Sequence, residues 1–292
     1  MNKVGIFYAY WLRDWSADCF YYLNKVAALG FDILEVASPQ LVEMQPKELD
    51  ELRKASVDKG IEITAVVGFP PDKDMASADN TIRKDGIEYA RKTLEAVNQA
   101  GGRVFSGINY SSWPAVMNDI ISDKSPWWER SVNSIKEVAK TAEDYGITYN
   151  LEVVNRFEQF LMNTVDEGIA FCRQVGSSNV KLLIDTFHMN IEEDSIKDAI
   201  IKAKDYIGHL HIGENNRKCP GNGHLPWDEI FGALKKISYQ GHIVMEPFVK
   251  MGGEIGRDIR VWRSLVDDLS EESLDADVKK ALEFVRYKLM SA

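Results

Sequence analysis

Cysteine and histidine are scarce in this chain of 292 residues. The three cysteines, Cys19, Cys172 and Cys219, lie far apart, and no Cys-x-x-Cys pair occurs. This spacing predicts neither a disulfide framework nor a thiolate zinc site, and three reduced cysteines are typical of a cytoplasmic protein. The five histidines are too few for a His-rich site that binds several zinc ions.

An excess of positive charge and long apolar runs are also missing. The formal net charge is −10, which argues against nucleic acid as a partner, because nucleic-acid binding depends largely on Lys and Arg neutralising phosphates. No apolar run approaches the ~20 residues of a membrane helix. The first eight residues, MNKVGIFY, lack the apolar core and cleavage site of a signal peptide and predict a strand instead.

Strand and helix patterns alternate along the whole chain. The hydrophobic content of 45% and charged content of 27% are those of an ordinary globular protein. We predict strands at 4–8, 31–36, 61–67, 103–108, 147–153, 180–184, 207–212 and 243–246. Helical patterns lie at 17–29, 46–59, 81–100, 127–145, 165–175, 195–204, 227–237 and 274–290.

Eight strands that each precede a helix predict an α/β fold of the (β/α)8 TIM barrel type. We expect one domain over residues 1–292. The alternative, a doubly wound open sheet, usually has a Gly-rich phosphate loop after its first strand, and none follows Tyr8. Glycines after the helices, at positions 30, 60, 101, 146, 176 and 241, predict left-handed helix ends. Two adjacent glycines in segment 245–258 predict a mobile lip beyond the last strand.

Four successive strands in the second half each end close to a metal-type ligand. These ligands are Glu152, Asp185, His211 and Glu246, separated by 33, 26 and 35 residues. Because the carboxyl ends of parallel barrel strands meet at one face, we expect the four side chains to converge there. Three carboxylates and one imidazole suit one hard or borderline cation per subunit, Mn²⁺ or alternatively Co²⁺ or Mg²⁺.

Further polar and aromatic residues surround these positions. Glu158, His188 and Arg217 follow the ligands by three to six residues and are predicted to hydrogen-bond a polyhydroxylated ligand from the loops. Aromatic faces pack on sugar C–H edges, and the aromatic candidates near the strand ends are Phe7, Trp113, Phe248 and, less directly, Trp15.

Other polar residues are given different roles. His209 shares strand parity with His211 and is predicted to lie one layer deeper, in the core or behind the ligands. Glu35, near the end of the second strand, faces either the site or away from it. His224 and His242 are predicted in loops.

These motifs resemble the D-tagatose 3-epimerase family, which includes the D-psicose (D-allulose) 3-epimerases. The similarity covers essentially the whole chain and runs through VGIFY (4–8), EVVNRFE (152–158), DTFHMNIEE (185–193), PGNG (220–223) and VMEPF (244–248). The resemblance implies a (β/α)8 barrel that assembles as a homodimer or homotetramer. It places the metal ligands at the same four positions, the catalytic pair at Glu152 and Glu246, and contacts to the first sugar hydroxyls at Glu158, His188 and Arg217.

The resemblance predicts epimerisation of free ketohexoses at C3, such as D-tagatose to D-sorbose or D-fructose to D-psicose. Two carboxylates on opposite sides of C3 would exchange a proton with the carbon, and a bound metal would stabilise the enediolate charge. The preferred ketose stays open, because Phe7 matches the tagatose branch where many psicose epimerases carry Tyr.

Three functions other than ketose 3-epimerisation are also considered. An aldose–ketose isomerase on the same fold would move the proton between C1 and C2 instead. A metal-dependent phosphoesterase acting on abasic DNA would need a His-rich site and a basic groove, which the five histidines and the charge of −10 oppose. A sugar-binding protein without activity has no need for a metal between two carboxylates.

Overall fold

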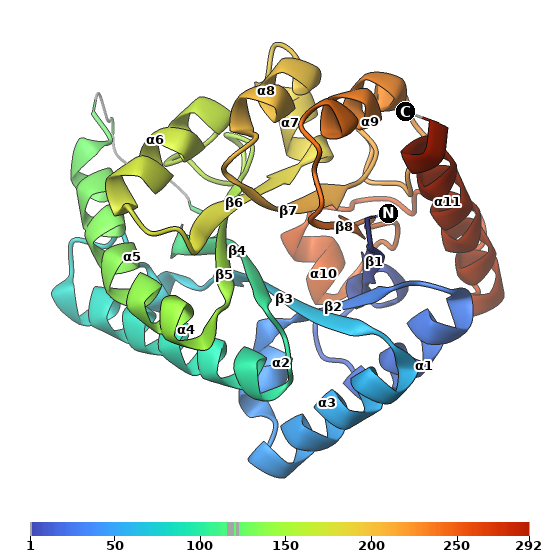
Figure 1. Ribbon diagram of the computed structural model, residues 1–292, viewed down its shortest axis with the longest axis horizontal. Coiled ribbons are helices and arrows are strands. Elements are labelled where there is room, and N and C mark those ends of the chain that lie inside the picture. Colours follow the sequence, from blue (N-terminus) through green and yellow to red (C-terminus); the bar gives the residue numbers. More distant parts are fainter. Residues whose placement is uncertain (1, 116–119, 121–122, 292) are drawn as a thin grey trace.

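Eight parallel strands close into a barrel in the computed structural model, which describes residues 2–115, 120 and 123–291. The strands follow one another around the ring in chain order, and the last pairs with the first (Figure 1). The predicted barrel is confirmed, and the open sheet is excluded. The strands are β1 (Val4–Phe7), β2 (Ile33–Ala37), β3 (Glu62–Phe69), β4 (Val104–Ser112), β5 (Thr148–Val153), β6 (Val180–Asp185), β7 (Ile207–Ile212) and β8 (His242–Met245).

A ring of helices surrounds the strands (Figure 1). All eight predicted helices are present, two of them with the predicted limits: α1 (Cys19–Leu29), α3 (Pro46–Lys59), α4 (Asn80–Gln99), α5 (Ser125–Tyr145), α6 (Val165–Val175), α8 (Ile196–Ala203), α9 (Trp227–Lys236) and α11 (Glu271–Ser291). In the described part of the chain, no helix is long and apolar enough to cross a membrane.

Short helical turns at the strand ends were not predicted. They are α2 (Ser38–Glu43), α7 (Thr186–Glu192), α10 (Gly253–Asp258) and the 3₁₀ segments η1 (Tyr8–Trp11) and η2 (Pro71–Lys73). Each of the five lies in a connection that follows a strand, at the carboxyl-end face of the barrel. Segments this short carry too few turns to show a helical period in the sequence.

Local capping explains where the long helices begin and end. The side chains of Asp79 and Thr164 accept hydrogen bonds from backbone N–H groups in the first turns of α4 and α6. Gly30, Gly60, Gly146 and Gly176 end their helices in the left-handed conformation, as predicted. Gly241 is the exception, because α9 has ended five residues earlier, at Lys236, and Gly241 leads directly into β8.

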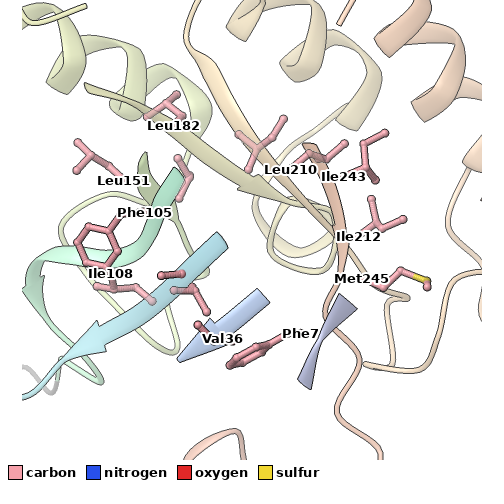
Figure 2. Packing of buried hydrophobic residues seen from close by; sticks show 14 of the residues in the cluster. Phe7, Val36, Phe105, Ile108, Leu151, Leu182, Leu210, Ile212, Ile243 and Met245 are labelled. Atoms are coloured by element: carbon pink, nitrogen blue, oxygen red, sulfur yellow. The ribbon is translucent and has the colours of Figure 1, made fainter. Parts of the chain in front are cut away.

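Apolar residues on the strands form the layer between the barrel and its helices. Figure 2 shows side chains of this core from successive strands, among them Leu151, Leu182, Leu210 and Ile243. Their immediate neighbours along each strand point the other way, into the barrel. Most of these neighbours are polar, such as Asn150, Glu152, His209 and His211, whereas Leu183 and Val244 are apolar. The apolar side chains stabilise the barrel from outside and leave its interior free for chemistry.

The barrel interior is unusually polar. Glu35, Thr64, Asn150, His209 and His211 are all buried, with 0–1% of their surface exposed. Branched apolar side chains usually fill this space in such barrels. Buried polar side chains such as these need hydrogen-bond partners. We infer that these five residues support the site at the carboxyl-end face.

Gly107 is expected to be essential for the stability of the β3–β4 pair. Its φ is +119°, and a Cβ atom there would lie 2.0 Å from the carbonyl oxygen of Val67. Gly107→Ala should therefore lower the free energy of unfolding by roughly 2–3 kcal/mol, measured by urea denaturation. The control is Gly232→Ala in α9, where a Cβ meets nothing within 4 Å and a gain of about 0.5–1 kcal/mol is expected. Equal stability of the two variants would contradict this account.

Candidate active site

The four predicted metal ligands lie at the carboxyl ends of β5 to β8. Glu152 and His211 are next to last in their strands, Asp185 is the last residue of β6, and Glu246 follows β8 directly. All four are buried, and Glu246 is the most exposed at 8%. Oxygen and nitrogen atoms of Glu152, His211 and Glu246 lie within 4.8 Å of one another, and so do those of Glu152, Asp185 and His188. Glu152 belongs to both clusters and joins them.

His211 presents one ring nitrogen to this site. Its Nε2 lies 2.6 Å from Oε2 of Glu35. Its Nδ1 is buried without a hydrogen-bond partner among the described residues and lies 3.4 Å from Oε1 of Glu246. Because an ionised Glu35 can only accept, Nε2 carries the proton and the Nδ1 lone pair faces a carboxylate. Two electron-rich groups at this separation need a proton or a cation between them, so the residues fit a divalent metal.

The crowded carboxylates have perturbed ionisation. Burial raises the pKa of Glu152 above its ordinary value, and the nearby charge of Glu246 adds to the increase. Burial likewise raises the pKa of Asp185, with a further contribution from Glu246. A cation would reverse this, because it would stabilise the ionised forms of both carboxyl groups.

Arg217 partly neutralises the same carboxylates. Its Nη1 lies 3.3 Å from Oδ2 of Asp185 and 3.2 Å from Oε2 of Glu246. The guanidinium carbon lies 3.7 Å from the centre of the Phe187 ring, a stacking arrangement that suits arginine. Arg217 has a φ of 63°, which is uncommon outside glycine and occurs at sites where the surrounding structure compensates the strain.

The position of Arg217 depends on Glu214, a residue to which the sequence assigned no role. Glu214 is fully buried. Its carboxylate accepts hydrogen bonds from the backbone N–H groups of Gly221 and Leu225 and from the indole of Trp227. This carboxylate therefore holds the β7–α9 loop in the shape that directs Arg217 into the site.

Glu158 and His188 form a connected pair above Glu152. Asn155 donates through Nδ2 to Oε1 of Glu158 (2.9 Å) and approaches Nδ1 of His188 at 2.7 Å. The N–H of Phe157 donates to Oδ1 of Asn155, which fixes the orientation of the amide. Nδ1 of His188 is thus an acceptor, and its Nε2–H points towards Oε1 of Glu152, 3.5 Å away.

Burial alone would raise the pKa of Glu158, but the positive charge of Arg217 and hydrogen bonds from Trp113 and Asn155 help to hold this pKa below its ordinary value. Trp113 donates its indole N–H to Oε2 of Glu158 at 3.0 Å. The Trp113 ring lies against Gly68, where a Cβ atom would approach the ring to 2.7 Å. Gly68 therefore makes room for this ring, and Glu158 is kept as an ionised acceptor.

A cavity of about 470 Å³ lies above these groups, which is within the usual size range of a small-molecule site. Glu152, Glu158, His188, Arg217 and Glu246 line its inner end, whereas Asp185 and His211 lie beneath the lining. All four aromatic candidates, Trp15 included, contribute walls, and Val66 joins them. The cavity lining therefore includes Phe7, Trp113 and Phe248.

The segment after β8 covers one side of the cavity. It was predicted as a mobile lip over the site. It contains the helix α10, and Asp258 at the end of this helix lines the cavity. Trp15 donates its indole N–H to Oδ2 of Asp258 at 2.9 Å, and the N–H of Ile255 donates to the carbonyl of Arg13 at 2.8 Å. These bonds tie α10 to the segment after β1. Mobility of the lip stays a prediction.

Some predicted surroundings of the site need correction. His188 projects from the short helix α7, not from a loop, because Asp185 caps that helix by accepting from the N–H of Phe187. His242 is the first residue of β8 and lies 2.6 Å from Glu62 at the opposite end of the barrel from the cavity. Glu35 faces the interior. His209 lies beside it, one layer below His211, as predicted.

Comparison with known proteins agrees with the resemblance. Residues 23–265 match the family of xylose isomerase-like TIM barrels. The D-psicose 3-epimerase of Ruminiclostridium cellulolyticum is 47% identical over 287 residues, which cover 98% of each chain. The chain belongs to the D-tagatose/D-psicose 3-epimerase family. It is therefore an isomerase, a carbohydrate epimerase.

A solved relative has the same overall form, and a more distant relative carries the name of another sugar. The crystal structure of D-psicose 3-epimerase with D-tagatose from Clostridium cellulolyticum H10 superposes with a TM-score of 0.96 over 98% of this chain and 99% of that chain, at 47% identity. An L-ribulose 3-epimerase from Mesorhizobium japonicum is 35% identical over 273 residues, 92% of this chain and 89% of its own. Family membership therefore leaves more than one sugar open as the substrate.

Proposed function

We propose that this protein is a divalent-metal-dependent ketose 3-epimerase that interconverts free ketohexoses at C3, including D-fructose with D-psicose and D-tagatose with D-sorbose. Relatives named D-psicose 3-epimerase match nearly the whole chain at 45–47% identity. Among the described residues, no lysine lines the cavity. Of its two lining arginines, Arg217 is engaged with Asp185 and Glu246, and Arg257 is paired with Asp258. A free sugar therefore fits better than a phosphorylated one.

The observation that carries the proposal is the convergence of Glu152 and Glu246. The two residues come from β5 and from the end of β8, with β6 and β7 between them, yet their carboxylates share one cluster with His211. A carbon atom held between two such carboxylates can lose a proton to one and receive a proton from the other on its opposite face. Inversion at C3 needs this arrangement.

Glu152, Asp185, His211 and Glu246 would hold one cation, Mn²⁺ or alternatively Co²⁺ or Mg²⁺. When bound, the cation would polarise the carbonyl beside C3 and stabilise negative charge on the sugar oxygens. His211 would contribute Nδ1, the ring atom without a hydrogen-bond partner among the described residues.

The chain's own residues move the proton. One of the two glutamates, ionised, takes the C3 proton through a carboxylate oxygen, and the other, protonated, returns one to the opposite face; the roles exchange in the reverse direction. Burial favours a proton on Glu152 and so opposes the effect of the cation on the same carboxyl group, which helps this residue to hold a proton between the two steps. His188 Nε2–H lies beside Glu152 and can donate to a sugar oxygen as charge develops on it.

Recognition of the sugar is divided between two ends of the cavity. Glu158, His188 and Arg217 would hydrogen-bond the hydroxyls at the reacting end, where all three lie within the polar cluster. Phe7, Trp113 and Phe248 would pack against the remaining carbons; the Phe7 and Phe248 ring centres lie 6.2 Å apart in an edge-on arrangement. Binding of both ends would hold C3 between the carboxylates and exclude water.

An aldose–ketose isomerase is the second candidate, because the matching family of barrels is described as xylose isomerase-like. The two reactions differ in the carbon that exchanges its proton. We propose incubating the Mn²⁺-loaded enzyme in D₂O with D-fructose, D-tagatose or D-psicose and following the sugars by NMR. Deuterium at C3 together with the C3 epimer supports the epimerase, and the fastest sugar identifies the preferred substrate. Deuterium at C1 or C2 with an aldose product would refute it.

Assembly and location complete the proposal. We propose a homodimer or homotetramer, supported by large apolar side chains that are well exposed, such as Phe157 at 65% and Trp262 at 69%. Light scattering after gel filtration would give the number of chains directly.

We propose a cytoplasmic location because Cys19, Cys172 and Cys219 are all unpaired and buried, as expected in a reducing compartment.

A further inference from the structure

We propose that Glu35 is the positioning residue of the metal site, which holds His211 in the ring orientation and tautomer that a cation requires. Glu35 lies on β2 and His211 on β7, and β8 and β1 stand between these strands in the ring. Their contact of 2.6 Å therefore crosses the interior of the barrel. This inference rests on the metal site proposed above and adds a residue outside its ligand set.

The carboxylate of Glu35 is held at both oxygens. Oε2 accepts from Nε2 of His211, and Oε1 accepts from Nε2 of His209 at 2.9 Å and from the hydroxyl of Thr64 at 2.9 Å. The glutamate is fully buried. A buried charge with three donors has a single favourable position, because every lost donor would leave the charge less compensated.

This fixed carboxylate determines which nitrogen of His211 is free. A proton on Nε2 is required for the bond to Glu35, so the lone pair is on Nδ1, which points at the Glu246 carboxylate. Without Glu35 the ring could rotate or carry its proton on Nδ1, and either change would remove a ligand. Metal-binding histidines commonly have a carboxylate in this position, and loss of such a partner lowers metal affinity 10- to 100-fold.

His209 belongs to the same unit but acts one step further away. It contacts Glu35 and not the carboxylates of the metal cluster, and its ring centre lies 5.2 Å from that of His211. Its role is therefore to keep the Glu35 carboxylate in place. Removal of His209 should affect the cation less than removal of the charge on Glu35.

A second cation site is the alternative for Glu35, His209 and His211, because the ligand atoms of these three residues lie within 4.8 Å of one another. The geometry favours hydrogen bonds, since both imidazole Nε2 atoms already lie 2.6–2.9 Å from the Glu35 oxygens. A cation there would have to displace both ring protons. One Mn²⁺ per chain is therefore expected, and two per chain would overturn this assignment.

The experiment measures Mn²⁺ binding to the full chain after chelator treatment, by titration calorimetry and by the electron paramagnetic resonance signal of free Mn²⁺. Glu35→Gln keeps the size of the side chain but offers one acceptor oxygen to two imidazole N–H groups. For Glu35→Gln, the expected dissociation constant for Mn²⁺ is 10- to 100-fold larger than that of the wild type. The matched control is Glu62→Gln, since the Glu62 carboxylate also contacts an imidazole, that of His242, but lies partly exposed at the opposite end of the barrel and pairs with Lys3. Its dissociation constant should stay within about twofold of the wild type.

A spectroscopic measurement separates positioning from general loosening of the fold. In Co²⁺-loaded protein, Glu35→Gln should change the visible absorption bands, which report the ligands and their geometry, whereas Glu62→Gln should leave them unchanged. His209→Leu provides a second variant in case Glu35→Gln does not fold, and a dissociation constant weakened about threefold or more is expected.

The two proposals fail in different ways. Absence of Mn²⁺ binding by the wild-type chain would refute the metal site itself. Normal Mn²⁺ binding by the wild type, together with unchanged affinity and unchanged Co²⁺ spectra in Glu35→Gln or, where that variant does not fold, in His209→Leu, would refute the role of Glu35 alone. An equal loss of affinity in Glu62→Gln would also refute it, because the effect would then be a general one.

Discussion

Glu246→Gln is expected to lower kcat for C3 epimerisation by at least ~10² while one Mn²⁺ per chain stays bound. The amide cannot take or return a proton, but its oxygen can still occupy the place of a carboxylate oxygen beside His211 and Arg217. The loss should therefore appear in kcat more than in KM. Initial rates over a range of D-psicose and D-fructose concentrations, with Mn²⁺ content measured in the same samples, check this result.

Comparing Glu246→Gln with Glu152→Gln tests which glutamate acts on each face of C3. If the two glutamates serve opposite faces of C3, each variant should still exchange the C3 proton of one epimer with D₂O and fail with the other. The two variants should differ in which epimer they exchange. Glu62→Gln, at the far end of the barrel, is the control and should retain normal turnover. Near-normal epimerisation by Glu246→Gln would end the two-carboxylate scheme.

The fold was predictable because its signals are local and repeated. Eight apolar strand patterns alternate with amphipathic helices, and residues such as Asp79, Thr164 and Gly176 mark the helix ends. The short helices α2, α7 and α10 were missed because their positions depend on tertiary contacts. Helix α10, for example, is tied to the β1–α1 connection through Arg13 and Trp15.

The candidate site was predictable where strand order alone brings residues together. Glu152, Asp185, His211 and Glu246 come from successive strands, so their convergence follows from the barrel. The support around them was not predictable in the same way. Asn155, which orients His188, resembles any loop asparagine in the sequence. The direction of Glu35 could not be fixed, because its imidazole partners, His209 and His211, reach it from β7 across the barrel interior.

The supporting role of Glu214 could not be predicted from the sequence either. Its carboxylate binds two backbone N–H groups and one indole from residues 7 to 13 positions later in the chain. A sequence shows the acidic residue but not the folded loop that surrounds it. Residues that act by direct chemistry can be recognised by type and spacing, whereas residues that hold others in place become visible only through their contacts.

Removal of the cation is the second change with a large expected effect. After chelator treatment, turnover should fall below about 1% of the Mn²⁺-loaded value, because stabilisation of several kcal/mol at the sugar oxygens is lost. The melting temperature should also fall by roughly 5 °C or more, since a ligand present at 100 times its dissociation constant stabilises the folded chain by about 2.7 kcal/mol. Added Mn²⁺ should restore both. Full turnover in protein shown to be free of metal would contradict the proposed function.

The stabilisation by Mn²⁺ should increase with pH. The pKa values of Glu152 and Asp185 are raised in the folded chain, and that of His211 is raised well above 6.5. Without a cation, the folded state therefore binds more protons than the unfolded state, and its stability falls as the pH rises through these raised values. A cation replaces the protons, so the rise in melting temperature on adding Mn²⁺ should be larger at pH 8 than at pH 5.5. Thermal scans of both forms test this, and a stabilisation that shrinks with rising pH would show that protons and Mn²⁺ do not compete for these side chains.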